Sequence, residues 1–220
     1  MIRIKICGIT SAADALAACE AGANSLGLNF YEQSPRHVSI AGASKIREQI
    51  PKQVEAVGVF VNLSVAEVLS ICAVVGLDAA QLHGDESPRI AAEISRKLRV
   101  TKAFRVNADF SLDTLKLFPE AYAFLLDAAQ AGQYGGTGHT TDWALARRAA
   151  AAHRIILAGG LKPENVAAAI RVVRPWAVDV ASGVESKPGK KDHARLREFI
   201  QAVRDAEKQL DSPAEQSNVL

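Results

Sequence analysis

Long hydrophobic runs are missing from this sequence, and so is an excess of charge of either sign. Its apolar stretches are interrupted within a few residues by glycine or by charged residues such as Glu20 and Asp78, so none reaches the run of about 18 residues needed to cross a membrane. The 26 Lys and Arg residues nearly balance the 24 Asp and Glu residues, and no basic block stands out. These absences argue against a membrane protein and against a nucleic-acid-binding protein.

Cysteine is also scarce. The three cysteines, Cys7, Cys19 and Cys72, lie far apart and form no CxxC pair, which favours a reduced thiol state over a disulfide framework. No histidine or cysteine has further ligands at a metal-binding spacing, so we expect no metal. The N-terminus enters a strand-like segment at once, without room for a signal peptide, and we therefore expect a cytoplasmic protein.

What the sequence does contain is a regular alternation of two kinds of segment. Short runs of β-branched and other apolar residues, typical of buried strands, occupy residues 2–7, 25–30, 54–61, 79–83, 100–106, 122–127, 154–158 and 177–181. Helix-like segments follow them at residues 11–18, 43–49, 65–75, 89–98, 111–118, 143–152, 164–173 and 193–208. The segments at 43–49 and 111–118 have the weakest helical pattern.

Eight strand–helix units in one chain of 220 residues predict an α/β protein with a single (β/α)8 TIM barrel at residues 1–207. The alternative, a doubly wound open sheet, would normally carry a GxGxxG fingerprint after its first strand, and the sequence there is Cys7-Gly8-Ile9-Thr10. Residues 208–220 are polar and interrupted by proline, and we expect a disordered tail there.

The first strand has a polar face that needs an explanation. Arg3, Lys5 and Cys7 alternate with three isoleucines, and a strand covered on both faces directs such side chains to the centre of the barrel. Buried charges are costly unless paired. Asp179 shares its parity with Ala177 and Ala181, so we expect it to point inward on the last strand, which closes against the first, and we predict that it pairs with Lys5 or Arg3.

The carboxyl ends of barrel strands and the loops after them form the active sites of TIM barrels. Polar side chains occupy these places here: Cys7, Asn29, Arg36, Asn62, His83, Arg105, Asp127 and Ser182. A cation near Cys7 favours its thiolate, and the carboxyl of Asp127 suits an acid–base role or the cap of a turn. Arg36 suits a substrate carboxylate, whereas His83 could be a rim hydrogen-bonding group or part of the core.

Three glycine-containing segments lie at the same end. Residues 132–138 include Gly135 and Gly136, and this loop is either a mobile rim or a close backbone approach to an anion. Gly159 and Gly160 end the seventh strand, while Ser182 and Gly183 end the eighth. A phosphate site between the last two loops is a recurrent feature of barrels, because their backbone N–H groups converge on an anion.

These residues resemble those of a known family, the phosphoribosylanthranilate isomerases of tryptophan biosynthesis. The matching pieces, in order, are Lys-Ile-Cys-Gly-Ile-Thr (5–10), Ser-Pro-Arg (34–36), Val-Gly-Val-Phe-Val (57–61), Gln-Leu-His-Gly (81–84), Leu-Asp (126–127), Gly-Gly-Thr-Gly (135–138), Leu-Ala-Gly-Gly-Leu-Lys-Pro-Glu-Asn-Val (157–166), Ser-Gly-Val-Glu (182–185) and Pro-Gly-Lys-Lys-Asp (188–192). Together they cover all of the chain except its tail.

The resemblance implies a cofactor-free Amadori rearrangement of N-(5′-phosphoribosyl)anthranilate to 1-(2-carboxyphenylamino)-1-deoxyribulose 5-phosphate. It implies that Asp127 is the general acid, Cys7 the general base and Arg36 the partner of the anthranilate carboxylate. His83 and the glycine loops would contribute to substrate binding, with the last two loops holding the phosphate. A phosphosugar is then the expected small-molecule partner, of either a monomer or a homodimer.

Two alternatives remain open at the level of the sequence. Another phosphosugar barrel enzyme, such as an aldolase that forms a Schiff base on Lys5, would share most of these features. A barrel that binds a phosphosugar without catalysis would share the phosphate loops as well. A thiol-based redox or metal protein fits less well, because it lacks a resolving cysteine and ligand spacing.

Overall fold

The computed structural model describes residues 1–107, 110–128 and 142–211, and its central feature is a closed barrel of parallel strands. The barrel strands are β1 (Arg3–Cys7), β2 (Ser25–Asn29), β3 (Glu55–Phe60), β4 (Ala79–Leu82), β5 (Arg99–Val106), β6 (Ala123–Ala128), β7 (Ile155–Leu157) and β8 (Ala177–Val180). Each strand pairs with the next in the chain, and β8 returns to pair with β1. The predicted TIM barrel is confirmed.

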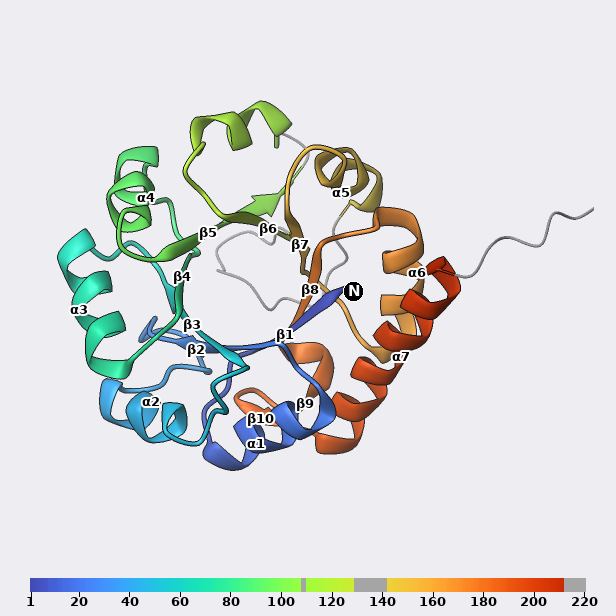
Figure 1. The fold of residues 1–220 in the computed structure, drawn as a ribbon, viewed down its shortest axis with the longest axis horizontal. Helices are drawn as coiled ribbons and strands as arrows, with labels where there is room; N and C mark the ends of the chain where they lie inside the picture. The colour runs from blue at the N-terminus through green and yellow to red at the C-terminus, as the bar shows by residue number, and fades with distance from the viewer. Residues whose placement is uncertain (108–109, 129–141, 212–220) are drawn as a thin grey trace, which may run out of the picture.

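Helices surround the barrel as an outer ring (Figure 1). They are α1 (Ala12–Ala21), α2 (Ile40–Arg47), α3 (Val65–Val75), α4 (Pro88–Ser95), α5 (Trp143–Ala150), α6 (Pro163–Val173) and α7 (His193–Asp211). Between β5 and β6 the predicted segment 111–118 forms a 3-10 helix, η1 (Leu112–Leu117). Helix α2 begins at Ile40, earlier than predicted, because the Ser39 side chain accepts a hydrogen bond from the Gly42 amide and caps it.

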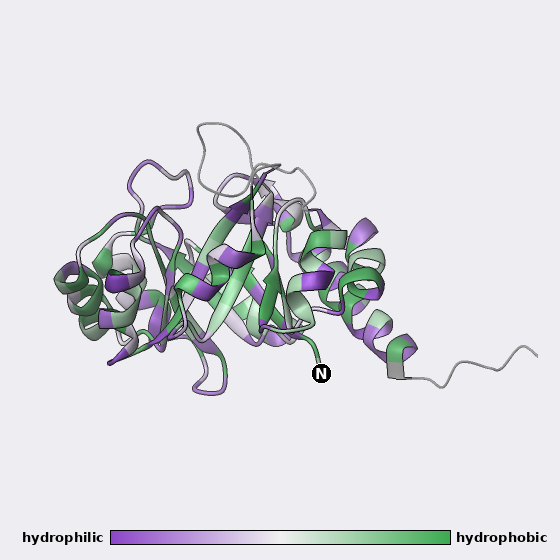
Figure 2. Ribbon diagram, turned by 90° about the horizontal axis from the view of Figure 1, so that it is seen from above, coloured by the Kyte–Doolittle hydropathy of each residue, from purple (hydrophilic) through white to green (hydrophobic). Residues whose placement is uncertain are grey.

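Among the residues that the structure describes, the buried apolar side chains form two clusters. The larger lies between the strands and the helices and includes Ile4, Ile6, Leu26 and Leu28. The strands form most of the hydrophobic centre of the molecule in Figure 2. The smaller cluster belongs to the barrel interior and consists mainly of small side chains: Ala103, Ala123, Leu125, Ile156, Ala158 and Ala177. Small residues on this side leave room for the polar side chains of the other strands.

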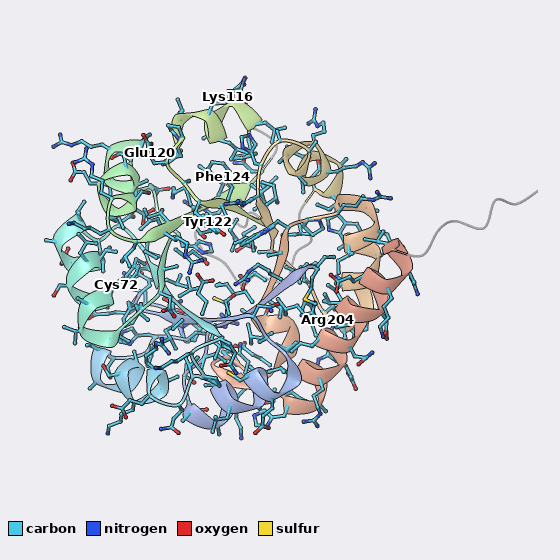
Figure 3. The ribbon with its side chains drawn as sticks, viewed as in Figure 1. Cys72, Lys116, Glu120, Tyr122, Phe124 and Arg204 are labelled. Atoms are coloured by element: carbon cyan, nitrogen blue, oxygen red, sulfur yellow. The ribbon has the colours of Figure 1, made fainter. Side chains whose placement is uncertain are left out.

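Helix α7 completes the ring between α6 and α1, and it also fixes the start of β1 (Figure 1). Arg204, labelled in Figure 3, donates a hydrogen bond of 2.8 Å to the Ile2 carbonyl and one of 3.3 Å to Asn24. The helix continues to Asp211, beyond the predicted beginning of the tail at residue 208, and residues 212–220 lie outside the described residues. Within the described ranges, no helix is both long and apolar enough to span a membrane.

A small antiparallel hairpin follows the barrel, and no pattern in the sequence predicted it. After β8, a 3-10 turn η2 (Ser182–Val184) leads into β9 (Glu185–Lys187) and β10 (Lys190–Lys191). Gly189 occupies the turn with φ 79°, a left-handed conformation that favours glycine. The hairpin lies beside α1 in Figure 1, and its side chains reach the end of β1.

Candidate active site

The predicted ion pair in the barrel interior is present. Lys5 and Asp179 face each other in the register of β1 and β8, with 3.0 Å between Lys5 Nζ and Asp179 Oδ1. Both residues are buried, at 4% and 8% exposure. Burial alone would lower the pKa of Lys5, but the negative charge of Asp179 and contact with Cys7 raise it above its ordinary value. Arg3, the other candidate partner, pairs with Glu55 at 3.4 Å instead.

Removing one member of this pair should destabilise the fold. In Asp179→Ala the ammonium of Lys5 stays buried without its carboxylate, and we expect the free energy of unfolding to fall by about 3–5 kcal/mol. Urea denaturation measures it. The matched control is Asp113→Ala, which breaks the exposed contact to Lys116 and should leave stability unchanged. A stable Asp179→Ala variant would mean that the pair does not compensate Lys5.

Cys7 ends β1 directly above the same ion pair and is partly exposed. Its partner in β2 is Gly27, and a Cβ at that position would lie 2.8 Å from the Cys7 Sγ and 3.2 Å from the Lys5 Nζ. The sulfur and the ammonium therefore share the space that a glycine leaves open. Burial raises the pKa of the Cys7 thiol above its ordinary value, and the positive charges of Lys5 and Lys191 oppose that shift in part.

Asp127 lies at the end of β6, and His83 reaches it from the end of β4. Asp127 is 4% exposed, and its Oδ2 lies 3.6 Å from His83 Nε2. The other ring nitrogen of His83, Nδ1, is hydrogen-bonded at 2.8 Å to Nε2 of the buried Gln81 on the same strand. The two strands are separated only by β5, so the barrel order brings these side chains together. The sequence alone leaves open whether His83 belongs to the rim or to the core.

The loops after β7 and β8 form one continuous pocket wall with Asp127. The pocket is lined by Asp127, Gly159, Gly160, Asp179 and Ser182 among others. Gly159 and Gly160 have φ values of 82° and 65°, a backbone conformation that side chains disfavour. A Cβ on Gly183 would overlap the Leu161 carbonyl oxygen, so the two loops are in backbone contact. Gly135 and Gly136, the other predicted binding glycines, lie outside the described residues.

Arg36 has a partner that sequence reasoning missed. Its Nε and Nη2 donate hydrogen bonds of 2.9 and 2.7 Å to the two carboxylate oxygens of Glu185 in β9. Its aliphatic part packs over Gly8, where a Cβ would lie 2.5 Å from Arg36 Cδ. The only signal in the sequence was the glutamate that ends the Ser-Gly-Val-Glu segment, which by itself indicates no partner.

Known proteins are similar to this sequence over nearly its whole length. The family model described as N-(5′-phosphoribosyl)anthranilate (PRA) isomerase matches residues 4–202. The N-(5′-phosphoribosyl)anthranilate isomerase of Geobacter metallireducens is 50% identical over 204 residues, which are 93% of this chain and 100% of the relative. That of Pelobacter propionicus is 48% identical over 205 residues, 93% of this chain and 97% of the relative.

A solved structure is also similar to this protein over nearly its whole length. The crystal structure of phosphoribosyl anthranilate isomerase from Thermotoga maritima superposes with a TM-score of 0.87 at 41% identity, covering 93% of this chain and 100% of that one. Family model, sequence relatives and fold therefore agree over nearly the whole chain. The chain belongs to the N-(5′-phosphoribosyl)anthranilate isomerase family, the aldose–ketose isomerases of tryptophan biosynthesis.

Proposed function

We propose that this isomerase catalyses the Amadori rearrangement with Asp127 as general acid and Cys7 as general base. Asp127 gives its proton to the ring oxygen of the ribose, the bond from that oxygen to C1′ breaks, and an iminium forms. Cys7 then removes the proton from C2′, which leaves an enolamine that tautomerises to the ketone. Ketone formation adds a proton at C1′ and releases the proton of the C2′ hydroxyl, so the proton that Asp127 gave and the proton that Cys7 took balance over one turnover, and no external oxidant is needed.

The observation that carries this proposal is the placement of the two groups. Both lie at the carboxyl ends of their strands, where barrel active sites form, and β7 and β8 separate the two strands. An acid at the end of β6 and a base at the end of β1 suit two proton transfers at neighbouring sugar atoms. The pocket that Asp127 shares with the loops after β7 and β8 supports a phosphate position there.

The base must lose its own proton before it can act. Lys5 and Lys191 each lower the pKa of Cys7, although burial outweighs them in the free protein. Lys5 and Lys191 therefore favour the thiolate form that the base needs, whereas burial disfavours it. Gly135, Gly136, Gly159, Gly160, Ser182, Gly183, His83 and Arg36 stay assigned to substrate binding in this proposal, Arg36 to the anthranilate carboxylate.

The Schiff-base alternative is disfavoured by the state of Lys5. A lysine that attacks a carbonyl must be neutral, and aldolases achieve this by lowering the pKa of the amine. Here the pKa of Lys5 is raised, because Asp179 holds its ammonium at 3.0 Å. Lys5 is thus suited to stabilise a nearby anion rather than to act as a nucleophile.

The proposed function is tested by following the fluorescence of phosphoribosylanthranilate, which disappears on conversion to the ketose. We expect the wild-type protein to remove it and both Cys7→Ala and Asp127→Asn to do so far more slowly. Cys19→Ser, which changes a thiol in α1 outside the site, is the matched control and should retain full activity. Full activity of either site variant would overturn the role assigned to that residue.

A substitution at Gly27 tests whether the position of the Cys7 sulfur matters, without removing the thiol. In Gly27→Ala the new methyl group would lie 2.8 Å from Cys7 Sγ, so the sulfur must shift. Displacement of a reacting group by about 1 Å can cost on the order of 10²-fold, and we expect kcat/KM to fall about 10- to 100-fold. Steady-state kinetics measure this. An unchanged kcat/KM in a variant whose circular dichroism matches wild type would show that the position of the sulfur is not critical.

A further inference from the structure

The hairpin formed by β9 and β10 places two buried charged residues, Glu185 and Lys191, beside Arg36. Glu185 accepts two hydrogen bonds from Arg36, and its Oε1 also accepts one of 2.9 Å from Lys191 Nζ and one of 3.3 Å from the Gly189 amide. The side chains of Glu185 and Lys191 are 4% and 0% exposed, and that of Arg36 is 13% exposed. Burial would raise the pKa of Glu185, but its hydrogen bonds to Arg36 and Lys191 hold it below its ordinary value.

Lys191 connects Glu185 to the ends of β1 and β8. Besides Glu185, its ammonium donates hydrogen bonds of 2.6 Å to the Cys7 carbonyl and 3.2 Å to the Ala181 carbonyl. All three N–H donors of the ammonium are thereby engaged. Glu185 is thus held by a cation that is itself hydrogen-bonded to the backbone at the ends of β1 and β8.

The way Glu185 binds Arg36 leaves one edge of the guanidinium for another anion. A guanidinium has five N–H donors in a planar fork, and Glu185 occupies the Nε–Nη2 edge. The Nη1–Nη2 edge has the same spacing and can bind a second carboxylate with two parallel hydrogen bonds. One glutamate between two cations leaves a net positive charge, so the pairing does not cancel the attraction for a further anion.

We propose that Glu185 is a positioning residue that sets substrate specificity by directing the free edge of Arg36 at the carboxylate of the substrate's aromatic amine. The inference rests on the proposed function, in which Arg36 binds that carboxylate. Without Glu185 the long arginine side chain could adopt several rotamers, and the entropy of ordering it would reduce the affinity for carboxylated ligands. Glu185 itself need not touch the ligand.

The test compares two stable product analogues by calorimetry: reduced 1-(o-carboxyphenylamino)-1-deoxyribulose 5-phosphate, the ligand of one solved relative, and the same compound made from aniline, without the carboxylate. The Kd of the carboxylate-free analogue divided by the Kd of the carboxylated analogue reports carboxylate recognition alone. We expect the ratio to fall about tenfold in Glu185→Gln and in Arg36→Met, while the carboxylate-free analogue binds all variants equally. In turnover, Glu185→Gln should raise KM about tenfold and change kcat by less than about threefold.

One further test variant and one control variant complete this experiment. Glu185→Asp keeps the negative charge beside Lys191 but withdraws it from Arg36 by one methylene, so it should fold and still lose recognition. Glu164→Gln, which breaks an exposed pair with Arg195, is the matched control and should retain the wild-type ratio. If Arg36→Met loses recognition and both Glu185 variants keep it, the positioning role is wrong and the proposed function stands.

The remaining outcomes are also decisive. If Arg36→Met keeps the wild-type ratio, Arg36 does not bind the carboxylate, and both the proposed role of Arg36 and this inference fail. If the two analogues weaken equally in the Glu185 variants, the residue supports the whole site and is not a specificity determinant. Only a selective loss for the carboxylated analogue agrees with the inference.

Discussion

Replacing Cys7 by alanine is expected to lower kcat/KM for phosphoribosylanthranilate by about 10²- to 10⁴-fold, the usual contribution of a general base. The variant removes the sulfur but not its surroundings, because the Lys5–Asp179 pair and the Lys191 hydrogen bond to the Cys7 carbonyl do not depend on the thiol. Binding of the product analogue should therefore be nearly unchanged. The measurement is the initial rate of fluorescence loss at several substrate concentrations.

The ionisation of Cys7 can be measured separately from turnover. Acid and base need opposite protonation states, so a pH–rate profile mixes both groups, whereas alkylation by iodoacetamide follows the thiolate alone. Because burial raises the pKa of the thiol, the thiolate fraction should still be rising about tenfold per pH unit through the ordinary range of a cysteine. Mass spectrometry of the Cys7 peptide gives the rate. A plateau already at neutral pH would contradict the raised pKa.

If Cys7→Ala keeps more than about a tenth of the wild-type kcat/KM, the thiolate is not the base, because even a modest base contributes more than that. Lys5→Met provides an internal comparison. It should raise the pKa of Cys7 further by removing the cation beside the sulfur, which would slow both alkylation and turnover.

The barrel was predictable because its evidence is local and repeated. Apolar runs alternate with helix-like segments, and in the structure the side chains of Ser11, Ser64, Ser87 and Asp142 accept the hydrogen bonds that cap four of these helices. Closure of the barrel then follows from the number of units. The same closure explains why the Lys5–Asp179 pair could be predicted, since it needs only the parity of two strands that must become neighbours.

Contacts between loops were not predictable in the same way. The Arg36–Glu185 pair joins residues 149 positions apart, and both lie outside the barrel strands, so neither parity nor spacing indicates it. The hairpin that carries Glu185 and Lys191 is short, and its charged residues suggest an ordinary exposed loop. The contact of His83 with Asp127 needed the side-chain rotamers as well as the strand order.

Asp127→Asn is expected to lose about 10²- to 10⁴-fold in kcat/KM, because the N–H groups of an amide of the same shape are too weakly acidic to protonate the ribose ring oxygen. The loss should be found in kcat, since the substituted amide would keep the pocket formed with Gly159, Gly160 and Ser182. Steady-state kinetics and calorimetry with the product analogue measure the two effects independently. Asp113→Asn, on the exposed 3-10 turn before β6, is the matched control.

His83 lies beside Asp127 and is the other group that could donate the proton, so the test has to distinguish the two residues. Its Nε2 lies 3.6 Å from the carboxylate, near enough to stabilise the anion that forms once Asp127 has given up its proton. If His83 were itself the acid, Asp127→Asn would leave a proton donor in place and the loss would be small, whereas His83→Asn would abolish turnover. A large loss in Asp127→Asn with a smaller one in His83→Asn assigns the proton to Asp127, and the reverse order would transfer that role to the histidine.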